Sequence, residues 1–326
     1  MSDPNICLIG GTGRSGTTIL KEVFEKHPDV ASAGEIRITT DPEGIVDFYT
    51  SCVHGWSPYL YDVKVKRLRK LLRDTGRNTL VRRFYTYAVA RSGLRRAPRI
   101  LVPRYAEVRL ERHCPGYFEL VDELMARLTD YRYQGRWTGC EFWQDSRLTY
   151  KAPLERAELA DILGTFLRGV IERIVTAKGG KHFVEDTPWN ILWFDKLLEL
   201  LPEARLVHIY RDPRDVTASF CKQWWAPSEP RHAAYWCKGI LERWWRVRES
   251  LPKESFCEIA LERLIGDTDT TVRELCEFWR IPYDRALLTT DLAHGHGGRW
   301  RADFTAAQQA EVSEILREQV EALGYR

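Results

Sequence analysis

A glycine-rich stretch near the start of the chain, residues 6–18, constrains the fold more than any other feature of the sequence. It reads ICLIGGTGRSGTT: an apolar run, then glycines and hydroxyl residues, after which apolar residues recur at helical spacing as far as Phe24. This pattern predicts a strand, a tight loop and a helix. The backbone N–H groups of such a loop, together with the positive end of the helix dipole, bind phosphate-like anions. We therefore expect a phosphorylated ligand at this loop.

The loop fits two nucleotide-binding motifs at once. Gly11, Gly13 and Gly16 fit the G-x-G-x-x-G pattern of dinucleotide-binding proteins, and Glu35 lies at about the right distance downstream for a ribose contact. Residues 11–18 also fit the frame of a P-loop, in which the second glycine is followed by a lysine and a hydroxyl residue. The loop alone leaves both interpretations open.

One position in the loop argues against a nucleoside triphosphate. Thr17 stands where a P-loop NTPase has the lysine that reaches the β- and γ-phosphates. Arg14, inside the loop, is a cation that can supply the missing charge from another direction. The rest of the chain has to identify the ligand.

Alternating strand and helix patterns predict an α/β fold with a central parallel sheet. Short apolar runs typical of parallel strands occur at residues 30–33, 206–210 and 256–260, and a helical pattern covers residues 159–177. We expect the helix after the second of these runs to cover residues 216–225. The last helix should begin at Thr305, because Gln308 follows it in capping-box spacing.

Residues 39–150 do not follow this alternation, and their pattern predicts short helical segments rich in basic and aromatic residues. Between Lys64 and Arg112 there are sixteen Lys or Arg residues against three acidic ones, although the whole chain has a net charge of only +3. Because we find no repeat and no low-complexity linker, we predict one domain over residues 1–326 with this segment as an insertion on the acceptor side. Its charge indicates either a solvated helical face or a surface that recruits an anionic acceptor. Nucleic acid is not expected, since no nucleic-acid motif accompanies the charge.

The composition indicates the cellular compartment of the protein and the state of its cysteines. No apolar run approaches the ~18 residues of a membrane span, and the first strand follows the N-terminus too closely for a signal peptide, so we expect a cytoplasmic protein without a transmembrane segment. The eight cysteines form no C-x-x-C pair and no metal-ligand spacing with the histidines. We therefore expect reduced, structural thiols and no metal.

Three segments that are far apart in the chain look like parts of one anion site. They are the glycine loop, Arg211 at the carboxyl end of a strand, and the basic loop around Arg299. In a doubly wound sheet such loops converge beyond the carboxyl ends of the strands. Two arginines in addition to the loop suggest a ligand with a second phosphate, and Ser219 could donate to the same group.

These motifs resemble those of the sulfotransferases that use 3′-phosphoadenosine 5′-phosphosulfate (PAPS). GTGRSGTT resembles their 5′-phosphosulfate loop, LVHIYRDPRDVTASF their 3′-phosphate segment, and EIALERLIGDTDTTVRELCEFWRIPYD and GGRWR the segments that close over the nucleotide. In motif style the chain is similar to the tyrosylprotein and heparan types and to bacterial members. The resemblance implies a three-layer α/β fold with a P-loop-like phosphosulfate loop, and it leaves residues 39–150 largely uncovered.

The resemblance also assigns roles to individual residues. Arg14 would stabilise the leaving 5′-phosphate, and Glu35 would be the catalytic base, as in the tyrosylprotein and heparan branches. Without the resemblance, Glu35 could equally cap a helix or pair with Arg37, and Arg211 could pair with Asp215. The residues implied to hold the co-substrate are Gly13, Arg14, Ser15, Gly16, Thr17 and Thr18 for the phosphosulfate, Arg211 and Ser219 for the 3′-phosphate, Trp189 near the adenine, and Arg299 and Trp300 over the nucleotide.

One departure from the family pattern concerns the transferring group. Many relatives have a lysine before the Thr-Pro that opens the middle helix, and this chain has Asp186 there. Either Arg14 carries that role alone or a lysine from elsewhere, such as Lys151, completes the site.

The resulting hypothesis is an enzyme that moves sulfonate from PAPS to a hydroxyl of a glycan, a peptide tyrosine or a small metabolite. Such transfer depends on positioning and charge stabilisation, as phosphoryl transfer does. A kinase and a non-catalytic polyanion-binding protein on the same fold are the alternatives, and the missing lysine argues against the kinase.

Overall fold

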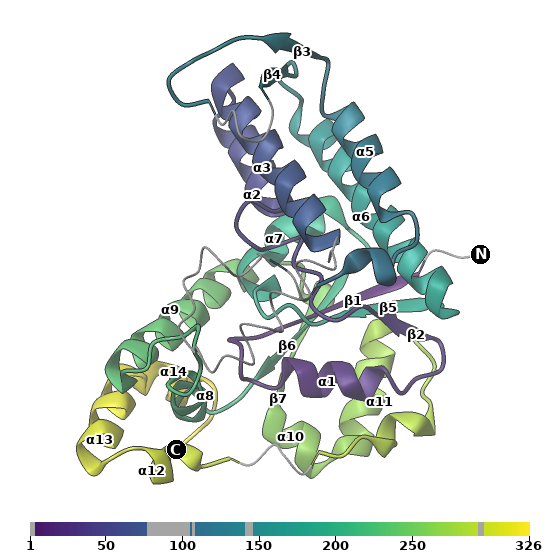
Figure 1. The fold of residues 1–326 in the computed structure, drawn as a ribbon. Coiled ribbons are helices and arrows are strands. Elements are labelled where there is room, and N and C mark those ends of the chain that lie inside the picture. The colour runs from purple at the N-terminus through teal and green to yellow at the C-terminus, as the bar shows by residue number, and fades with distance from the viewer. Residues whose placement is uncertain (1–3, 77–104, 106–107, 141–145, 293–296) are drawn as a thin grey trace, which may run out of the picture. The chain divides into compact units, whose positions relative to one another are not determined.

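The computed structural model describes residues 4–76, 105, 108–140, 146–292 and 297–326 (Figure 1). The chain divides into two compact units. The first, here called the sheet unit, consists of Met1–Gly34, Lys181–Leu198 and Glu203–Arg326. The second, here called the helical unit, consists of Glu35–Gly180 and Glu199–Pro202.

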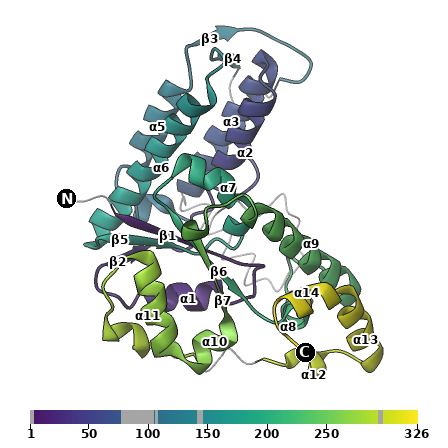
Figure 2. The same ribbon diagram turned by 180° about the vertical axis from the view of Figure 1, so that it is seen from behind.

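Parallel strands form the centre of the sheet unit, in the order β2-β5-β1-β6-β7 (Figures 1 and 2). Because β2 and β5 lie on one side of β1 and β6 and β7 on the other, the direction of strand addition reverses beside β1. In an open parallel sheet, ligands bind beyond the carboxyl ends of the strands at such a point. The predicted parallel sheet is confirmed. The strands are β1 (Asn5–Gly10), β2 (Val30–Ser32), β5 (His182–Glu185), β6 (Arg205–Tyr210) and β7 (Phe256–Ala260).

Helices cover both faces of this sheet, which confirms the predicted three-layer α/β arrangement. On one face, alternate residues of the strands form a buried cluster with helices α1 (Thr17–Phe24), α10 (Leu261–Gly266) and α11 (Thr268–Trp279). The crossovers that follow β5 and β6 carry α7 (Asn190–Leu200), α8 (Pro213–Phe220) and α9 (Pro230–Arg248) on the opposite face. There the His208 ring of β6 lies 5.1 Å from the Trp244 ring of α9.

Helix α8 is shorter than the sequence predicts. Asp212 accepts a hydrogen bond from the Arg214 N–H and Pro213 occupies the first turn, so the helix begins before the expected residue 216. The helix ends at Phe220, the last of its buried apolar residues. Trp224 was expected inside the helix, but it lies in the following loop and is 88% exposed. The prediction of residues 216–225 was therefore wrong at both ends.

The C-terminal helices pack against α8 and α9. The capping box at Thr305 and Gln308 is present as predicted. The single last helix expected from the sequence is divided at Leu316, whose φ and ψ angles are not helical. The three elements are α12 (Arg299–Asp303), α13 (Ala306–Ile315) and α14 (Arg317–Ala322).

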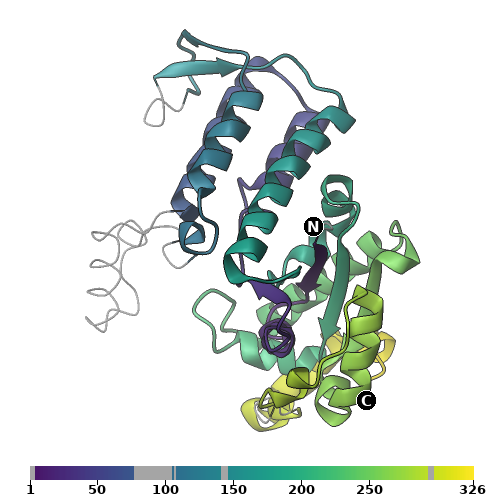
Figure 3. The same cartoon turned by 90° about the vertical axis from the view of Figure 1, so that its right-hand side faces the viewer.

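The helical unit contains four longer helices, among its described residues, and a small antiparallel sheet. Figure 3 shows α3, α5 and α6 running alongside one another. Residues 77–104 of the predicted 39–150 insertion lie outside the described residues. That residues 1–326 form one domain stays a prediction. The helices are α2 (Ile45–His54), α3 (Pro58–Gly76), α5 (Tyr117–Arg127) and α6 (Arg156–Lys178).

A β-hairpin in this unit was not predicted from the sequence. Strands β3 (Tyr131–Gln134) and β4 (Arg147–Tyr150) pair antiparallel. In β3 tyrosines alternate with polar residues, and Tyr131 stacks on Tyr150 of β4 with ring centroids 4.9 Å apart. Such cross-strand aromatic pairs stabilise hairpins, and this short signal was overlooked within a segment read as helical. Across the described part of the chain, no helix combines the length and apolar character needed to cross a membrane.

Candidate functional site

The glycine loop, which joins β1 to α1, contains three residues with left-handed backbone angles. Gly13, Arg14 and Gly16 have φ angles of 75°, 60° and 107°. Glycine adopts this region without a steric penalty, whereas for arginine it is strained, by about 1 to 3 kcal/mol. An arginine held in this way at the tip of a loop is typical of a functional position.

The first glycine of the loop is required by close packing. A Cβ atom on Gly11 would lie 2.2 Å from Ser15 Oγ and 2.7 Å from the Ile209 carbonyl oxygen. The Gly11 N–H donates to the Pro188 carbonyl oxygen, 3.0 Å away, which ties the loop to the segment after β5. The backbone of β1 thus turns directly against β6 at the point where the strand order reverses.

The loop has the unsatisfied groups expected of an anion site. Gly16 is the N-cap of α1 and provides no side-chain acceptor for the first N–H groups of the helix. Ser15 is fully buried, and its Oγ has no hydrogen-bond partner among the residues that the structure describes. Thr17 is buried beside it and Thr18 is exposed. These donors fit a phosphate or phosphosulfate group.

Arg14 contacts the segment that follows β6. Its Nε donates a hydrogen bond of 3.1 Å to Ser219 Oγ on α8. Ser219 was assigned from the sequence to the 3′-phosphate side and Arg14 to the 5′-phosphosulfate side. The structure thus brings together two residues from the two expected phosphate-binding segments.

Asp215 connects Arg211 to the loop before α12. Its Oδ2 lies 3.4 Å from Arg211 Nη2 and accepts a 2.7 Å hydrogen bond from the Gly298 N–H. Its Oδ1 accepts from the Trp300 N–H at 3.0 Å. The pairing of Arg211 with Asp215, the alternative weighed from the sequence, is therefore present, and the same carboxylate holds the Arg299 loop beside it.

Trp300 contacts two guanidinium groups. The Arg214 Cζ is 4.4 Å and the Arg301 Cζ 4.5 Å from the ring centroid, and the side chain is buried. These cation–π contacts fix the ring in place. Arg299, by contrast, is exposed. Contacts from this segment to a ligand are thus available from Arg299 and from the backbone of the loop.

Aromatic rings line the loop near Gly13. The Cβ position of Gly13 lies 3.7 Å from atoms of both Phe220 and Trp225. Trp236 packs against both of these rings, and Trp189 lies 6.2 Å from it between centroids. Trp189, proposed from the sequence to lie near an adenine, thus belongs to an aromatic group that borders the glycine loop.

A buried carboxyl group lies at the end of β5, next to β1. Glu185 accepts hydrogen bonds from the Thr187 N–H at 2.9 Å and from Asn190 Nδ2 at 2.6 Å, and from the Thr187 hydroxyl. Complete burial raises its pKa to about 8, against the lowering effect of these donors. Asp186 beside it is also buried. Because this position holds an aspartate, it does not supply the lysine that the resemblance led us to look for.

The remaining candidates, Glu35 and Lys151, belong to the helical unit. Glu35 Oε2 accepts a 2.5 Å hydrogen bond from Arg37 Nη2, so the alternative pairing considered from the sequence is present. Lys151 is paired with Asp130, 2.8 Å away.

Sequence reasoning missed the role of Asp215 as an anchor for Gly298 and Trp300. The only sequence signal was its place four residues after Arg211, which indicated the ion pair but not the two N–H contacts from a loop more than eighty residues later. Within the described ranges, no cluster of three or more His, Cys, Asp or Glu side chains could hold a metal ion.

Comparison with known proteins gives a family and several similar structures. The sulfotransferase STF9 from Mycobacterium avium is 14% identical, with a TM-score of 0.48, covering 100% of this chain and 78% of that one. The sulfotransferase domain of the olefin synthase from Synechococcus PCC 7002 is 17% identical, with a TM-score of 0.47, covering 100% and 97%. STF1 from Mycobacterium tuberculosis H37Rv is 16% identical, with a TM-score of 0.48, covering 96% and 76%. The search of curated proteins gave no match.

A sequence model described as the Sulfotransferase family matches residues 109–285. This segment includes β5 and β6, Trp189, Arg211 and Ser219, and it is more than half of the 326 residues. The glycine loop lies outside the matched segment but joins it through the Arg14 to Ser219 hydrogen bond. The chain therefore belongs to the Sulfotransferase family.

Proposed function

We propose that this protein transfers a sulfonate group from PAPS to a hydroxyl group of an acceptor. The observation that carries the proposal is the hydrogen bond between Arg14 and Ser219, because it joins the two segments expected to hold the two phosphate ends of one nucleotide. The buried, unpartnered hydroxyl of Ser15 supports it, since a phosphosulfate oxygen would satisfy that group. PAPS would supply the activated sulfonate.

Different residues of the sheet unit would bind different parts of PAPS. The loop residues Gly13 to Thr18 would hold the phosphosulfate through N–H and hydroxyl donors. Arg211 and Ser219 would bind the 3′-phosphate, and Trp189 would lie near the adenine. Arg299 and the backbone at Trp300 would cover the nucleotide, with the loop held by Asp215.

Two side chains would act in the transfer step. Arg14 would offset the charge that develops on the leaving 5′-phosphate, which is how electrostatic stabilisation lowers such barriers. The pairing of Lys151 with Asp130 favours Arg14 as the cation in this role. Glu35 would accept the proton of the attacking hydroxyl, a contribution of roughly 10²- to 10⁴-fold for a placed base.

The test is incubation of the full chain with radiolabelled PAPS and a panel of phenols, tyrosine peptides, glycans and lipids. We expect a labelled product from at least one acceptor. Glu35→Gln should lose turnover by about 10²-fold or more and still be stabilised thermally by adenosine 3′,5′-bisphosphate. Glu25→Gln is the control, since Glu25 pairs with Lys21 at the far end of α1.

Two outcomes would count against the proposed transfer, and a third would count only against the role of Glu35. Tight binding of the bisphosphate without product from any acceptor would favour a non-catalytic polyanion-binding protein. Stronger stabilisation by magnesium ATP would favour a kinase. Full turnover by Glu35→Gln would remove Glu35 as the base while leaving the transfer reaction in place.

A further inference from the structure

The loop of residues 221–229, here called the α8–α9 loop, places an aromatic ring beside the glycine loop. The ring is that of Trp225, and its Cη2 atom lies 3.7 Å from the Cβ position of Gly13. It packs in T-shaped geometry against Phe220 at the end of α8 and Trp236 of α9, with ring centroids 5.8 Å apart in both pairs. These contacts fix Trp225 beside the glycine loop, although 38% of the residue stays exposed.

The residue before it, Trp224, is almost fully exposed. At 88% exposure it gives the α8–α9 loop a second tryptophan ring in contact with solvent, directly next to Trp225. Large apolar side chains are normally buried in a folded chain, and adjacent exposed ones mark places where a ligand or a partner binds. The loop itself is held at its start, because the Gln223 N–H donates to the Phe220 carbonyl at 2.8 Å.

The direction of the glycine loop relates these rings to the group that is transferred. The free N–H groups at the start of α1 would bind the 5′-phosphate. The sulfonate is attached to that phosphate, and it would lie toward Gly13 and Arg14, the loop residues before the helix. Trp225 contacts Gly13 at this point, so a molecule that reaches the sulfonate from this side meets the tryptophan ring.

The surroundings of Gly13 on this side are apolar. Apart from its chain neighbours, the three atoms nearest to its Cβ position are Phe220 Cε1, Trp225 Cη2 and Pro188 Cβ, at 3.7, 3.7 and 4.0 Å. A sugar carries hydroxyl groups around its whole ring, and those that face carbon atoms lose their hydrogen bonds to water without a replacement. An aromatic ring has no polar groups on its faces and packs favourably against other rings. This wall therefore favours an aromatic molecule over a glycan.

We propose that Trp224 and Trp225 bind the sulfonate acceptor, and that this acceptor carries its hydroxyl group on an aromatic ring. The inference rests on the proposed function. The hydroxyl oxygen would form a bond to sulfur while the bond from sulfur to the 5′-phosphate oxygen breaks, and the hydroxyl proton would pass to Glu35. The tryptophans hold the ring so that its hydroxyl reaches the sulfonate. The chemistry recognised is that of a phenol, either a free small molecule or a tyrosine side chain.

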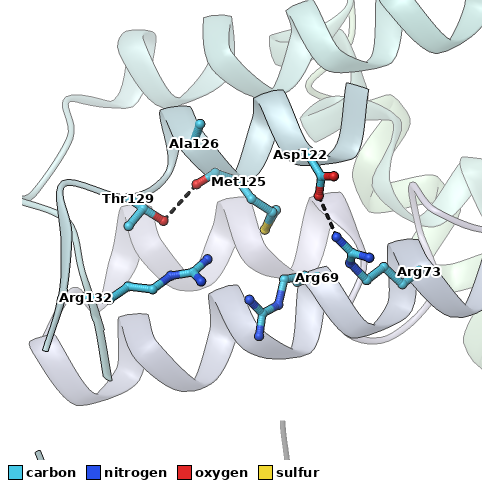
Figure 4. Close-up of a pocket in the computed structure, with 7 residues that line it drawn as sticks. All are labelled: Arg69, Arg73, Asp122, Met125, Ala126, Thr129 and Arg132. Carbon is cyan, nitrogen blue, oxygen red and sulfur yellow. Dashed lines mark hydrogen bonds and ion pairs between the residues drawn. The ribbon is translucent and has the colours of Figure 1, made fainter. Parts of the chain in front are cut away.

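The cavity of the helical unit gives no comparable support for an acceptor site. It has a volume of about 430 Å³ and lies between α3, α5 and β3 (Figure 4). Its three arginines already have partners. Arg73 Nη2 donates to Asp122 Oδ1 at 2.6 Å, as Figure 4 shows, and Arg69 of α3 and Arg132 of β3 are paired as well. The lining therefore contains no group that calls for a ligand among these arginines.

The first arm of the test compares alcohols that differ in their aromatic character. The probes are 2-naphthol, its saturated analogue decahydro-2-naphthol, N-acetyltyrosinamide and methyl glucoside, titrated by ligand-observed NMR with adenosine 3′,5′-bisphosphate at saturation. We expect 2-naphthol to bind about fivefold more tightly than its saturated analogue, and the glucoside to bind most weakly. The tighter of the two aromatic probes distinguishes a free phenol from a tyrosine side chain. Equal binding of the saturated analogue or the glucoside, or no binding of either aromatic probe, would overturn the proposal.

The second arm changes the two rings. Trp224→Ala and Trp225→Leu should each weaken binding of 2-naphthol by about fivefold or more, whereas Trp225→Phe, which keeps an aromatic ring, should retain most of it. Trp224 is so exposed that its replacement should leave folding intact even if a change at Trp225 does not. The matched control is Leu288→Ala. Leu288 is an exposed apolar residue of the short helix η4 (Arg285–Thr289), which packs against α1 and α11 on the other face of the sheet.

Adenosine 3′,5′-bisphosphate is titrated into the same variants, and its affinity should not change. If Trp224→Ala and Trp225→Leu weaken binding of the bisphosphate but not of 2-naphthol, the rings bind the nucleotide and the proposal is overturned. An equal loss of 2-naphthol binding in Leu288→Ala would overturn it too, because it would show a general surface effect. The two proposals can fail separately. Binding of 2-naphthol that depends on Trp224, without sulfonate transfer from PAPS, would leave the aromatic site standing and reject the enzyme, and transfer to a glycan without 2-naphthol binding would do the reverse.

Discussion

Arg14 and Ser219 are 205 residues apart in the chain, and a hydrogen bond of 3.1 Å joins the Nε of one to the Oγ of the other. The first is at the tip of the glycine loop and the second on the helix after β6. Their contact places the cation of the loop at the point where the strand order of the sheet reverses. If this is the cation for sulfonate transfer, its removal should affect the reaction much more than the fold.

Arg14→Ala should lower kcat/KM for sulfonate transfer by about 10²- to 10³-fold, the usual cost of removing one stabilising donor from a transition state. The exposed Arg14 side chain makes little contribution to the core, so the free energy of unfolding should change by less than about 1 kcal/mol. Initial rates with labelled donor and chemical denaturation measure the two effects. Lys21→Ala, which removes a cation further along α1, should leave the rate near that of the parent protein.

Gly11→Ala should both destabilise the protein and abolish nucleotide binding. The added methyl group would collide with the Ile209 carbonyl and with Ser15, and neither the strand backbone nor the buried hydroxyl can move away easily. Gly239→Ala is the matched control, because nothing lies within 4 Å of its Cβ position inside α9. It should stabilise the protein, by about 0.5 to 1 kcal/mol, through helix propensity. Similar changes in thermal midpoint for the two variants would contradict this account of the loop.

Asp215→Ala should lower the free energy of unfolding by about 2 kcal/mol or more, because it leaves the N–H groups of Gly298 and Trp300 without their acceptor. The loop before α12 would lose its anchor, so the affinity for adenosine 3′,5′-bisphosphate should fall as well. Denaturation and calorimetric titration test the two expectations. Asp269→Ala removes an exposed carboxylate paired with Arg273 and should have little effect on either quantity.

Local patterns predicted the sheet unit well, because each of its elements has a strong signal within a few residues. The strands β1, β6 and β7 are short, mostly apolar segments, and the capping box at Thr305 is complete within four residues. The hairpin β3–β4 was missed because its signal is short and its two strands are separated by more than ten residues. The end of α8 was predicted too late in the chain. The buried side chains of the helix end at Phe220, but the tryptophans that follow are apolar and give no sign of this in the sequence.

The candidate site was predictable as a set of segments but not as a set of contacts. The glycine loop and Arg211 follow from motif spacing, whereas Asp215 holds Gly298 through a contact that only the folded chain creates. The cavity lined by Arg69 and Arg132 illustrates the same limit, because its arginines come from a helix and from the hairpin that was overlooked.

The buried carboxyl group of Glu185 makes stability depend on pH in a direction opposite to that of most carboxylates. Burial raises its pKa from the usual 4.5 to about 8, so the folded protein retains a proton that the unfolded chain releases. Stability from this group is fully present below about pH 4.5 and is lost as pH rises toward 8, by no more than about 1.4 kcal/mol per pH unit. Glu185→Gln, which is neutral at every pH, should flatten that part of the stability curve.

Glu258 provides the contrasting case and the control for this prediction. Burial alone would raise its pKa, yet hydrogen bonds from His208 and Trp244 and the charge of Arg248 lower it to about 2. Its stabilising effect is present above about pH 4.5 and is lost as pH falls toward 2. Glu258→Gln should therefore change only the acid limb, and Glu185→Gln only the limb above it, in denaturation curves recorded from pH 3 to 9. If Glu185→Gln leaves the slope between pH 5 and 8 unchanged, Glu185 is ionised in the folded protein, and its three donors outweigh its burial.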